Sequence, residues 1–300
     1  SGHMRRATST ARIGGPALVA ALVCITSLLW PDWARSDTPF YEVTVPLGGP
    51  TEEDRARAFA EALQAVAVKA SGRRSAATNR TVAGANPARY VQRYAKTADQ
   101  MLKVGFAGTA VEELLQQAGL PLWPTERPVT VVTVTGADRT EIERAAAWRG
   151  LPITWGPGGA DASATLSGVP GASGFAWKFS HAGQTAEARG SVQDGVDLAA
   201  DTLAAYYAPP STRSTSNLSI SVGGMRDVTA YAALVRYLRS LSMVRDLSVE
   251  ALTGDVVRLR LTIQGDRQSL VRIAALDGRL QAAARSTDPA DAGVDFLFQP

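Results

Sequence analysis

The chain has very little cysteine and histidine. Its 300 residues include one cysteine and two histidines, which are Cys24, His3 and His181. A zinc site needs three or four Cys, His or carboxylate ligands, so the usual ligand sets cannot be assembled. A lone cysteine cannot form a disulfide within the chain, so stability cannot depend on one. We therefore expect no metal and no cofactor, and we expect His181 to be a surface or hairpin histidine.

The common catalytic motifs are also missing. The chain has no G-x-S-x-G, no S-x-x-K and no G-K-[ST] phosphate loop, which removes the usual serine hydrolases and nucleotide-binding loops. A pair of carboxylates would suffice for glycoside hydrolysis, and this possibility stays open. The candidate carboxylates, however, have simpler explanations: Glu52, Glu53, Asp54, Asp194 and Asp197 stand in a helix first turn, and Glu112 and Glu113 on a solvated helix face. We expect no catalytic residue and favour a protein that is not an enzyme.

One long apolar run is present, over residues 16–30. As a helix it would span roughly 22 Å, less than the ~30 Å hydrocarbon layer of a membrane. Three arginines precede it, and Ala34 and Ser36 place small residues before a cleavage site. This pattern predicts a secretory signal peptide over residues 4–36. Residues 1–3, ahead of Met4, resemble a cloning scar.

The predicted signal peptide determines the compartment and the charge. Cleavage between Ser36 and Asp37 would place the protein in the periplasm, with no stable membrane insertion. Cys24 follows Val23 rather than a small residue, so it does not match a lipid attachment site and would be discarded. Residues 37–300 have nearly balanced charge, because four arginines and one aspartate leave with the signal. The charge therefore gives no reason to expect nucleic acid as a partner.

Composition shifts divide the rest of the chain into three units. Prolines are dense in 121–128, and 209–217 is polar and of low complexity, so both predict linkers. The expected division is an N-terminal α/β unit over 37–120, a linker over 121–128, a middle α/β unit with antiparallel strands over 129–208, a linker over 209–217, and a C-terminal unit over 218–300.

Periodicity predicts the elements of each unit. In the N-terminal unit we expect a strand at 41–45, a helix from a capping box at Thr51 to Gly72, a short helix from Asn86 through Tyr94, a strand at 100–106 and a helix at 109–119. The middle unit begins as β-α-β and continues with antiparallel strands and a closing helix. The C-terminal order βαββαβ is that of a ferredoxin-like unit. The predicted fold class is α+β, a mixture of several small α/β units.

Tryptophan and arginine supply the candidate interaction residues. Trp148, Arg149, Trp155 and Trp177 all fall in the middle unit, and both residue types are enriched at binding hot spots. The alternative is that the tryptophans fill the core. In the C-terminal unit, Val257, Leu259, Leu261 and Ile263 alternate with Arg258 and Arg260, and this alternation predicts a sheet face for polar docking. We expect that unit to fold alone, with few contacts to the rest.

Several stretches together resemble a known family. They are "YEVTVPLGG", "NPARYVQRY", "AGLPLWPTERP", "AAAWRGLPITW" and "DVTAYAALVRYLRSL". The chain thereby resembles a proteobacterial family of uncharacterised exported proteins, domain of unknown function 2066. The resemblance covers most of residues 37–300 and is loose between "GPGG" and "WKF". It implies an exported protein and carries no catalytic residue over to this chain.

The leading hypothesis is a non-enzymatic periplasmic protein that binds a protein partner in the cell envelope, as an accessory factor of the envelope machinery. One alternative is a carboxylate-dependent enzyme acting on a glycan or peptidoglycan. A second is a soluble carrier of a small apolar ligand. The sequence names neither the partner nor the oligomeric state, and it does not show how the three units pack against one another.

Export predicts a defined N-terminus. Mass spectrometry of the protein from its natural host should find Asp37 as the first residue and no attached lipid, because the signal peptidase would remove residues 4–36. A chain that still carries Cys24 would contradict this prediction.

Overall fold

The structure is a computed structural model that describes residues 39–157, 163–283 and 293–300. The predicted signal peptide, residues 4–36, lies outside these residues. Within them, every helix is too short or too polar to cross a membrane. The described chain contains seven α-helices and three β-sheets, which confirms the predicted α+β class. We call the parts around the three sheets the N-terminal, middle and C-terminal lobes.

The N-terminal lobe is a three-stranded antiparallel sheet with helices packed against it. The sheet order is β1-β3-β2, and α1 packs against β1 and β3 and against α3. Short helical turns connect these elements. The bounds are β1 Glu42–Pro46, α1 Glu52–Ser71, α2 Arg80–Ala83, β2 Val91–Lys96, β3 Met101–Phe106 and α3 Gly108–Gln117, with 3-10 turns at Pro39–Tyr41, Arg74–Thr78, Pro87–Arg89 and Ala98–Gln100.

The two ends of α1 are as predicted. Thr51 accepts a hydrogen bond from the backbone N–H of Asp54, and the Asp54 carboxylate accepts one from the Thr51 backbone, so the capping box is present. Gly72 ends the helix at φ 67°, in the left-handed region that favours glycine. A Cβ at Gly72 would lie 2.4 Å from that of Ala204 and 2.8 Å from the Trp123 ring. This close packing also requires glycine there.

The prediction of a short helix from Asn86 through Tyr94 is wrong. Only Pro87–Arg89 form a helical turn, and β2 begins at Val91. The Asn86 side chain caps that turn by accepting from the Ala88 N–H, which explains the helix-like start. β2 then pairs antiparallel with β3, the next strand along the chain, and this hairpin pairing outweighs the local helical signal.

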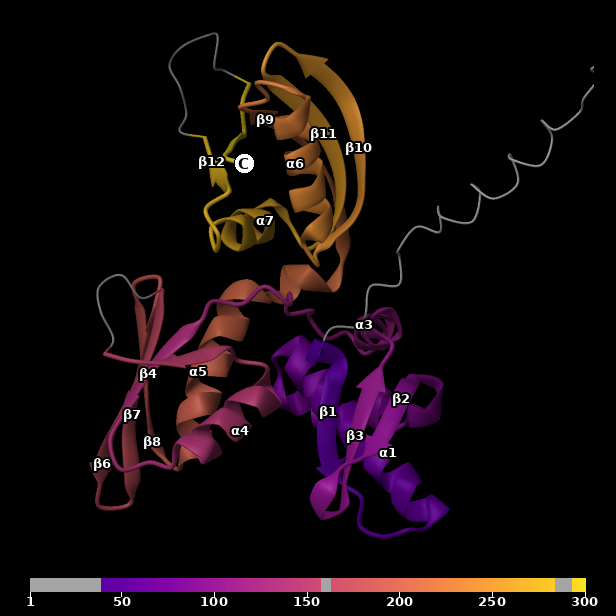
Figure 1. Cartoon of the computed structure of the whole chain (residues 1–300), viewed down its shortest axis with the longest axis vertical. Coiled ribbons are helices and arrows are strands. Elements are labelled where there is room, and N and C mark those ends of the chain that lie inside the picture. Colours follow the sequence, from indigo (N-terminus) through magenta and orange to yellow (C-terminus); the bar gives the residue numbers. More distant parts are fainter. Residues whose placement is uncertain (1–38, 158–162, 284–292) are drawn as a thin grey trace, which may run out of the picture. The chain divides into compact units, whose positions relative to one another are not determined.

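The middle lobe has a mixed five-stranded sheet of order β5-β4-β6-β7-β8. β4 is parallel to β5 and β6, while β6, β7 and β8 form an antiparallel meander. Helices α4 and α5 lie on one face of this sheet (Figure 1). The bounds are β4 Thr130–Val134, α4 Arg139–Arg149, β5 Ile153–Trp155, β6 Ala164–Gly171, β7 Gly174–His181, β8 Gln184–Gly190 and α5 Val192–Tyr207.

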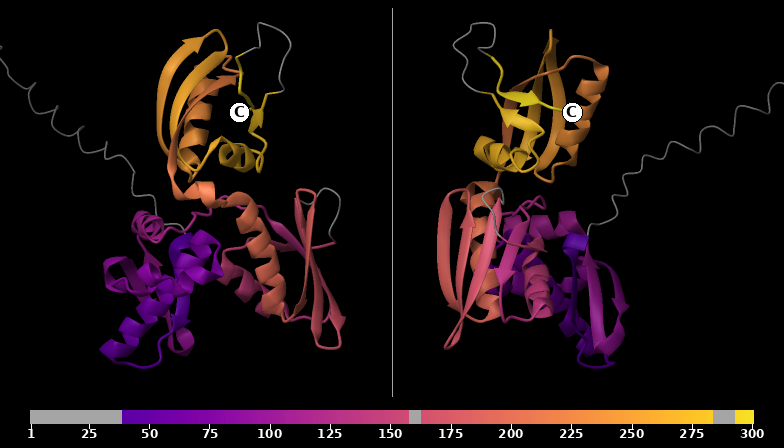
Figure 2. Two further views of the ribbon diagram at one scale, coloured as in Figure 1. Left: turned by 180° about the vertical axis from the view of Figure 1, so that it is seen from behind. Right: turned by 60° about the vertical axis from the view of Figure 1, so that its left-hand side comes forward.

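The C-terminal lobe has the predicted βαββαβ order with one strand added. Its sheet order is β10-β11-β9-β13-β12, and the β9–β12 part has ferredoxin-like connections. The last strand, β13, inserts between β9 and β12 and so is not at the edge. The left view of Figure 2 shows α6 on the concave side of the curved strands of this lobe. The bounds are β9 Thr215–Gly223, α6 Val228–Ser240, β10 Val244–Thr253, β11 Val256–Gln264, α7 Arg267–Ala274, β12 Leu280–Ala282 and β13 Phe296–Phe298.

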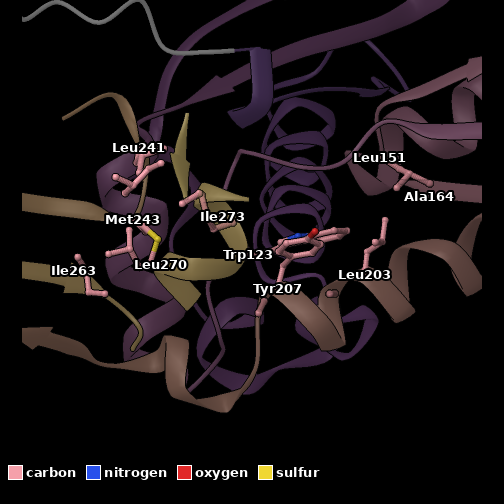
Figure 3. Close-up of a cluster of buried hydrophobic side chains, with 14 of the residues drawn as sticks. Trp123, Leu151, Ala164, Leu203, Tyr207, Leu241, Met243, Ile263, Leu270 and Ile273 are labelled. Atoms are coloured by element: carbon pink, nitrogen blue, oxygen red, sulfur yellow. The ribbon is translucent and has the colours of Figure 1, made fainter. Parts of the chain in front are cut away.

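The alternation predicted for β11 is confirmed. Val257, Leu259, Leu261 and Ile263 are fully buried, and Arg258 and Arg260 are exposed. The buried residues join one hydrophobic cluster that continues into the middle lobe through Trp123, Leu203 and Tyr207 (Figure 3). A second cluster fills the N-terminal lobe.

The two segments predicted as linkers are more ordered than their composition suggests. Segment 121–128 has no regular structure, yet Leu122, Trp123 and Arg127 are buried. In segment 209–217, Pro210–Arg213 form a 3-10 turn and β9 already begins at Thr215. The prolines of segment 121–128 lack the backbone N–H that a helix or a strand ladder needs, but they do not prevent burial.

The C-terminal lobe contacts the other lobes at several polar positions, although few contacts were expected. The Ser242 hydroxyl and N–H both donate to the Glu126 carboxylate, at 2.6 and 2.8 Å. Arg245 pairs with Glu112 of α3 at 2.7 Å. Gln264 accepts a 3.0 Å bond from Gln116. The C-terminal lobe therefore has more polar contacts with the rest of the described chain than the polar composition of 209–217 indicated.

Arg127 joins the N-terminal and middle lobes. Its guanidinium donates to the carbonyls of Lys69 at 2.7 Å, Arg149 at 3.0 Å and Gly150 at 2.7 Å. It also stacks on the Trp123 ring, 3.5 Å from the centroid. The three carbonyls lie at the C-terminal ends of α1 and α4. One buried cation therefore satisfies the last carbonyls of two helices from different lobes.

Replacing Arg127 with lysine should destabilise the protein. We expect Arg127→Lys to lower the free energy of unfolding by about 2–4 kcal/mol, because one ammonium cannot reach carbonyls spread around a planar fork and leaves some of them buried and unsatisfied. Denaturant unfolding measures the change. The matched control is Arg57→Lys on the exposed face of α1, which should change stability by less than about 0.5 kcal/mol. Equal effects of the two substitutions would contradict this role of Arg127.

Candidate functional site

The most accessible tryptophan among the described residues lies in a groove. Trp148, on α4, is 36% exposed and borders two hollows of about 310 and 330 Å³. We call the two hollows together the Trp148 groove. Its lining residues are Glu61, Gln64, Ala65, Val68, Arg74, Ala77, Glu141, Arg144, Ala145, Trp148, Arg149, Gln193 and Asp197.

Helical spacing explains how the walls of the groove form. The α1 wall uses positions 61, 64, 65 and 68, and the α4 wall uses positions 141, 144, 145 and 148. Both sets follow the i, i+3, i+4, i+7 pattern that places side chains on one helix face. Gln193 and Asp197, four residues apart on α5, complete the lining. The groove therefore combines residues of the N-terminal and middle lobes.

Arg149, the neighbour of Trp148, is a structural residue. It is 1% exposed and pairs with the carboxylates of Asp197 and Asp201. Its guanidinium also donates to the Gly72 carbonyl at 3.3 Å. Arg74 approaches the same two carboxylates from the solvent side. Arg149 thus borders the groove, but its charge is already neutralised, so it is not free to bind a partner.

The other two tryptophans predicted as interaction residues lie away from the groove. Trp177 is 1% exposed and donates from its indole N–H to the Ser191 carbonyl at 2.8 Å, so it fills the core of the middle lobe. Trp155 is half-buried, donates to Glu143 and stacks against Arg139. The structure brings together Trp148 and Arg149 and separates them from Trp155 and Trp177.

Arg258 and Arg260 lie on the open face of the C-terminal sheet. Arg260 pairs with Glu250 of β10, and Glu250 also accepts a hydrogen bond from Ser219 at 2.8 Å. Arg258 borders a hollow of about 190 Å³ with Ser221 and Thr253. This polar surface is separate from the Trp148 groove.

The described residues offer little for metal or acid–base chemistry. No three His, Cys, Asp or Glu side chains of these residues are placed to hold a metal ion. A cavity beside Tyr41 and Glu112 has about 20 Å³, room for about one water molecule. His181, expected to be a surface or hairpin histidine, lies at the end of β7 beside the hairpin turn to β8; it is 8% exposed and bonds to the Tyr207 hydroxyl at 3.1 Å. It serves the core of the middle lobe.

Comparisons with known proteins give one finding. Residues 34–124 match a family model described as a domain of unknown function (DUF8605). No curated protein and no solved structure is similar to the chain. The matched stretch includes the whole described N-terminal lobe and ends just after Trp123. It therefore supplies the α1 wall of the Trp148 groove, whereas α4 and α5 lie outside the match.

The sequence did not point to most of the groove. Gln64, Arg144 and Gln193 carried no motif, and Glu61 is one acidic residue of a long amphipathic helix. The available signal was the pairing of two stripes with the same i, i+3, i+4, i+7 spacing. That signal becomes visible only once α1 and α4 are known to be neighbours.

Lys69 is a buried lysine whose pKa is clearly lowered. It is 7% exposed, donates to the Glu42 carbonyl at 3.2 Å and lies over the Phe40 ring. Burial, reinforced by the nearby Arg127 charge and partly opposed by Glu42, lowers the pKa of Lys69 to about 8. The charged form is therefore disfavoured in the folded protein relative to the unfolded chain.

Stability should rise between pH 8 and pH 9.5. In this window the unfolded chain still binds the Lys69 proton while the folded protein releases it, so the free energy of unfolding should increase by about 1–2 kcal/mol. Tyr41, Tyr207 and Tyr237 have raised pKa values and act in the opposite direction only above about pH 10. Denaturant unfolding across the window checks this increase.

The matched variant for this experiment is Lys69→Met, which keeps the length of the side chain and removes the titration. Its stability should change little between pH 8 and 9.5. A slope that persists in this variant would assign the pH dependence to another group.

Proposed function

We propose that the protein is a non-enzymatic binding module, exported to the periplasm, where it acts as an accessory factor of the cell-envelope machinery. The observation that carries this proposal is the position of Trp148. A tryptophan that remains 36% exposed in a groove, with an exposed arginine one turn before it, is typical of a binding hot spot.

The lining of the groove supports binding over chemistry. Its aspartate, Asp197, is already paired with Arg149 and Arg74, so its carboxylate serves the interior of the protein. Glu61 and Glu141 line different hollows. A carboxylate-dependent enzyme needs two carboxyl groups on either side of one bond, so the binding role fits the geometry better.

Export and family membership are part of the same proposal. The pattern of residues 4–36 supports a signal peptide, and the stretches quoted above support a relationship to the proteobacterial domain of unknown function 2066. The match to a domain of unknown function over residues 34–124 is compatible with such a protein.

Site-specific crosslinking in the cell envelope tests the role of the groove. A photoreactive amino acid at position 144 should capture a defined partner. Trp148→Ala should lower the crosslinked yield about tenfold, because a truncated hot-spot tryptophan costs more than about 1–2 kcal/mol of binding.

The control for this experiment uses a tryptophan of the same lobe outside the groove. Trp155→Ala should leave the crosslinked yield unchanged, since Trp155 contacts Arg139 and Glu143 rather than the groove. An equal loss in both variants would indicate a general effect on folding. No Trp148-dependent capture at position 144 would remove the groove from the proposed function.

A further inference from the structure

We infer that the Trp148 groove binds a neutral oligosaccharide. This inference rests on the proposed binding function and names its ligand class. It depends on three features of the groove: an aromatic ring between two hollows, unpartnered polar side chains around it, and a balance of charge in each hollow.

Trp148 can contact ligand units in both hollows. Trp148 lines the hollow that contains Glu61 and Gln64, and also the hollow that contains Glu141 and Arg144. The face of an indole ring is electron-rich, and it attracts weakly positive C–H groups. A pyranose ring presents such C–H groups on one face and hydroxyls at its rim, so it can stack on Trp148 and still bond to the walls.

The polar side chains beside Trp148 match the rim of a sugar. An amide both donates and accepts hydrogen bonds, and Gln64 and Gln193 present amides from α1 and α5. Gln193 uses one N–H on Asp197, whereas Gln64, Glu61 and Arg144 have no side-chain partner among the residues that the structure describes. Hydroxyl groups, which also donate and accept, are the complementary ligand groups.

The charges argue against an ionic ligand. The first hollow is lined by the carboxylates of Glu61 and Asp197 and by the guanidiniums of Arg74 and Arg149. The second hollow is lined by Glu141 and Arg144. Each set sums to zero, so neither a phosphate nor a cationic peptide would gain net attraction there. A neutral ligand rich in hydroxyls does not need a net charge in the groove, because it binds through hydrogen bonds and ring stacking.

The size of the groove indicates more than one sugar unit. Hollows of about 310 and 330 Å³ each lie at the lower end of the ~300–1,000 Å³ range of small-molecule sites. Because Trp148 borders both, a ligand that uses the whole groove places units on either side of the ring. The ligand class is therefore a disaccharide or a longer oligosaccharide.

Calorimetric titration of the protein with defined saccharides tests this inference. The probes are the tetramer of N-acetylglucosamine and the tetramer of glucose, both neutral, with a sulfated oligosaccharide as the charged comparison. We expect at least one neutral tetramer to bind, and to bind more tightly than its monomer and the sulfated probe. The difference between the two tetramers shows whether acetamido groups contribute.

Three variants locate the binding. Trp148→Ala should weaken the affinity about tenfold or more, and Trp148→Phe should weaken it only about threefold, because an aromatic face remains. Gln64→Leu should weaken it through the lost hydrogen bonds without changing the fold. Trp155→Ala should leave the affinity unchanged.

If neither neutral tetramer binds at millimolar concentration, the inference is overturned. Binding that Trp148→Ala leaves unaltered would overturn it as well. Trp148-dependent capture of a protein partner without saccharide binding would also overturn it, and in that case the proposed binding function would stand. If neither Trp148-dependent capture nor saccharide binding is found, the groove has neither the proposed binding function nor the inferred ligand.

Discussion

The arrangement of the N-terminal and middle lobes depends on the Arg127 guanidinium. Helices α1 and α4 end beside each other, and each is ended by a glycine in the left-handed conformation, Gly72 and Gly150. Two helix C-termini repel through their partial negative charges. The guanidinium bonds to carbonyls of both ends and stacks on Trp123, so it converts this repulsion into a shared attraction. A Cβ at Gly150 would lie 2.7 Å from the guanidinium, which explains glycine at the point of closest approach.

A second buried arginine extends the same junction. Arg149 is the last residue of α4 and reaches Gly72 as well as Asp197 and Asp201 of α5. Consecutive residues on a helix point about 100° apart, so the burial of Arg149 turns the preceding Trp148 toward the opening between α1 and α4. The exposure of Trp148 is therefore a consequence of how Arg149 is held. Trp148 is available to a ligand in the groove, whereas Arg149 holds α4 against α1 and α5.

The parts of the fold that local patterns determine could be predicted from sequence. The α1 capping box, the alternation in β11 and the βαββαβ order of the C-terminal lobe all depend on neighbours within a few residues. The failures came from strand pairing and burial that the local residue patterns do not reveal. β2 forms because β3 is available as a partner, and Arg127 is buried because two helix ends from different lobes need donors. Within the candidate site, Trp148 and Arg149 could be singled out by residue type. Gln64 and Gln193 could not, since nothing along the chain shows that α1 and α5 meet at α4.

The groove is a property of two lobes in combination. The family match over residues 34–124 includes the α1 wall, but the aromatic ring and the α5 amide come from residues 148 and 193. Neither lobe alone places polar groups on both sides of Trp148. The buried junction through Arg127 and Arg149 sets the spacing between α1 and α4, and this spacing determines whether a ligand unit can enter beside the ring. Burying two guanidiniums costs desolvation free energy. The same two side chains hold the helices that line the groove, so the interior of the protein determines the shape of the site at which we propose that it binds.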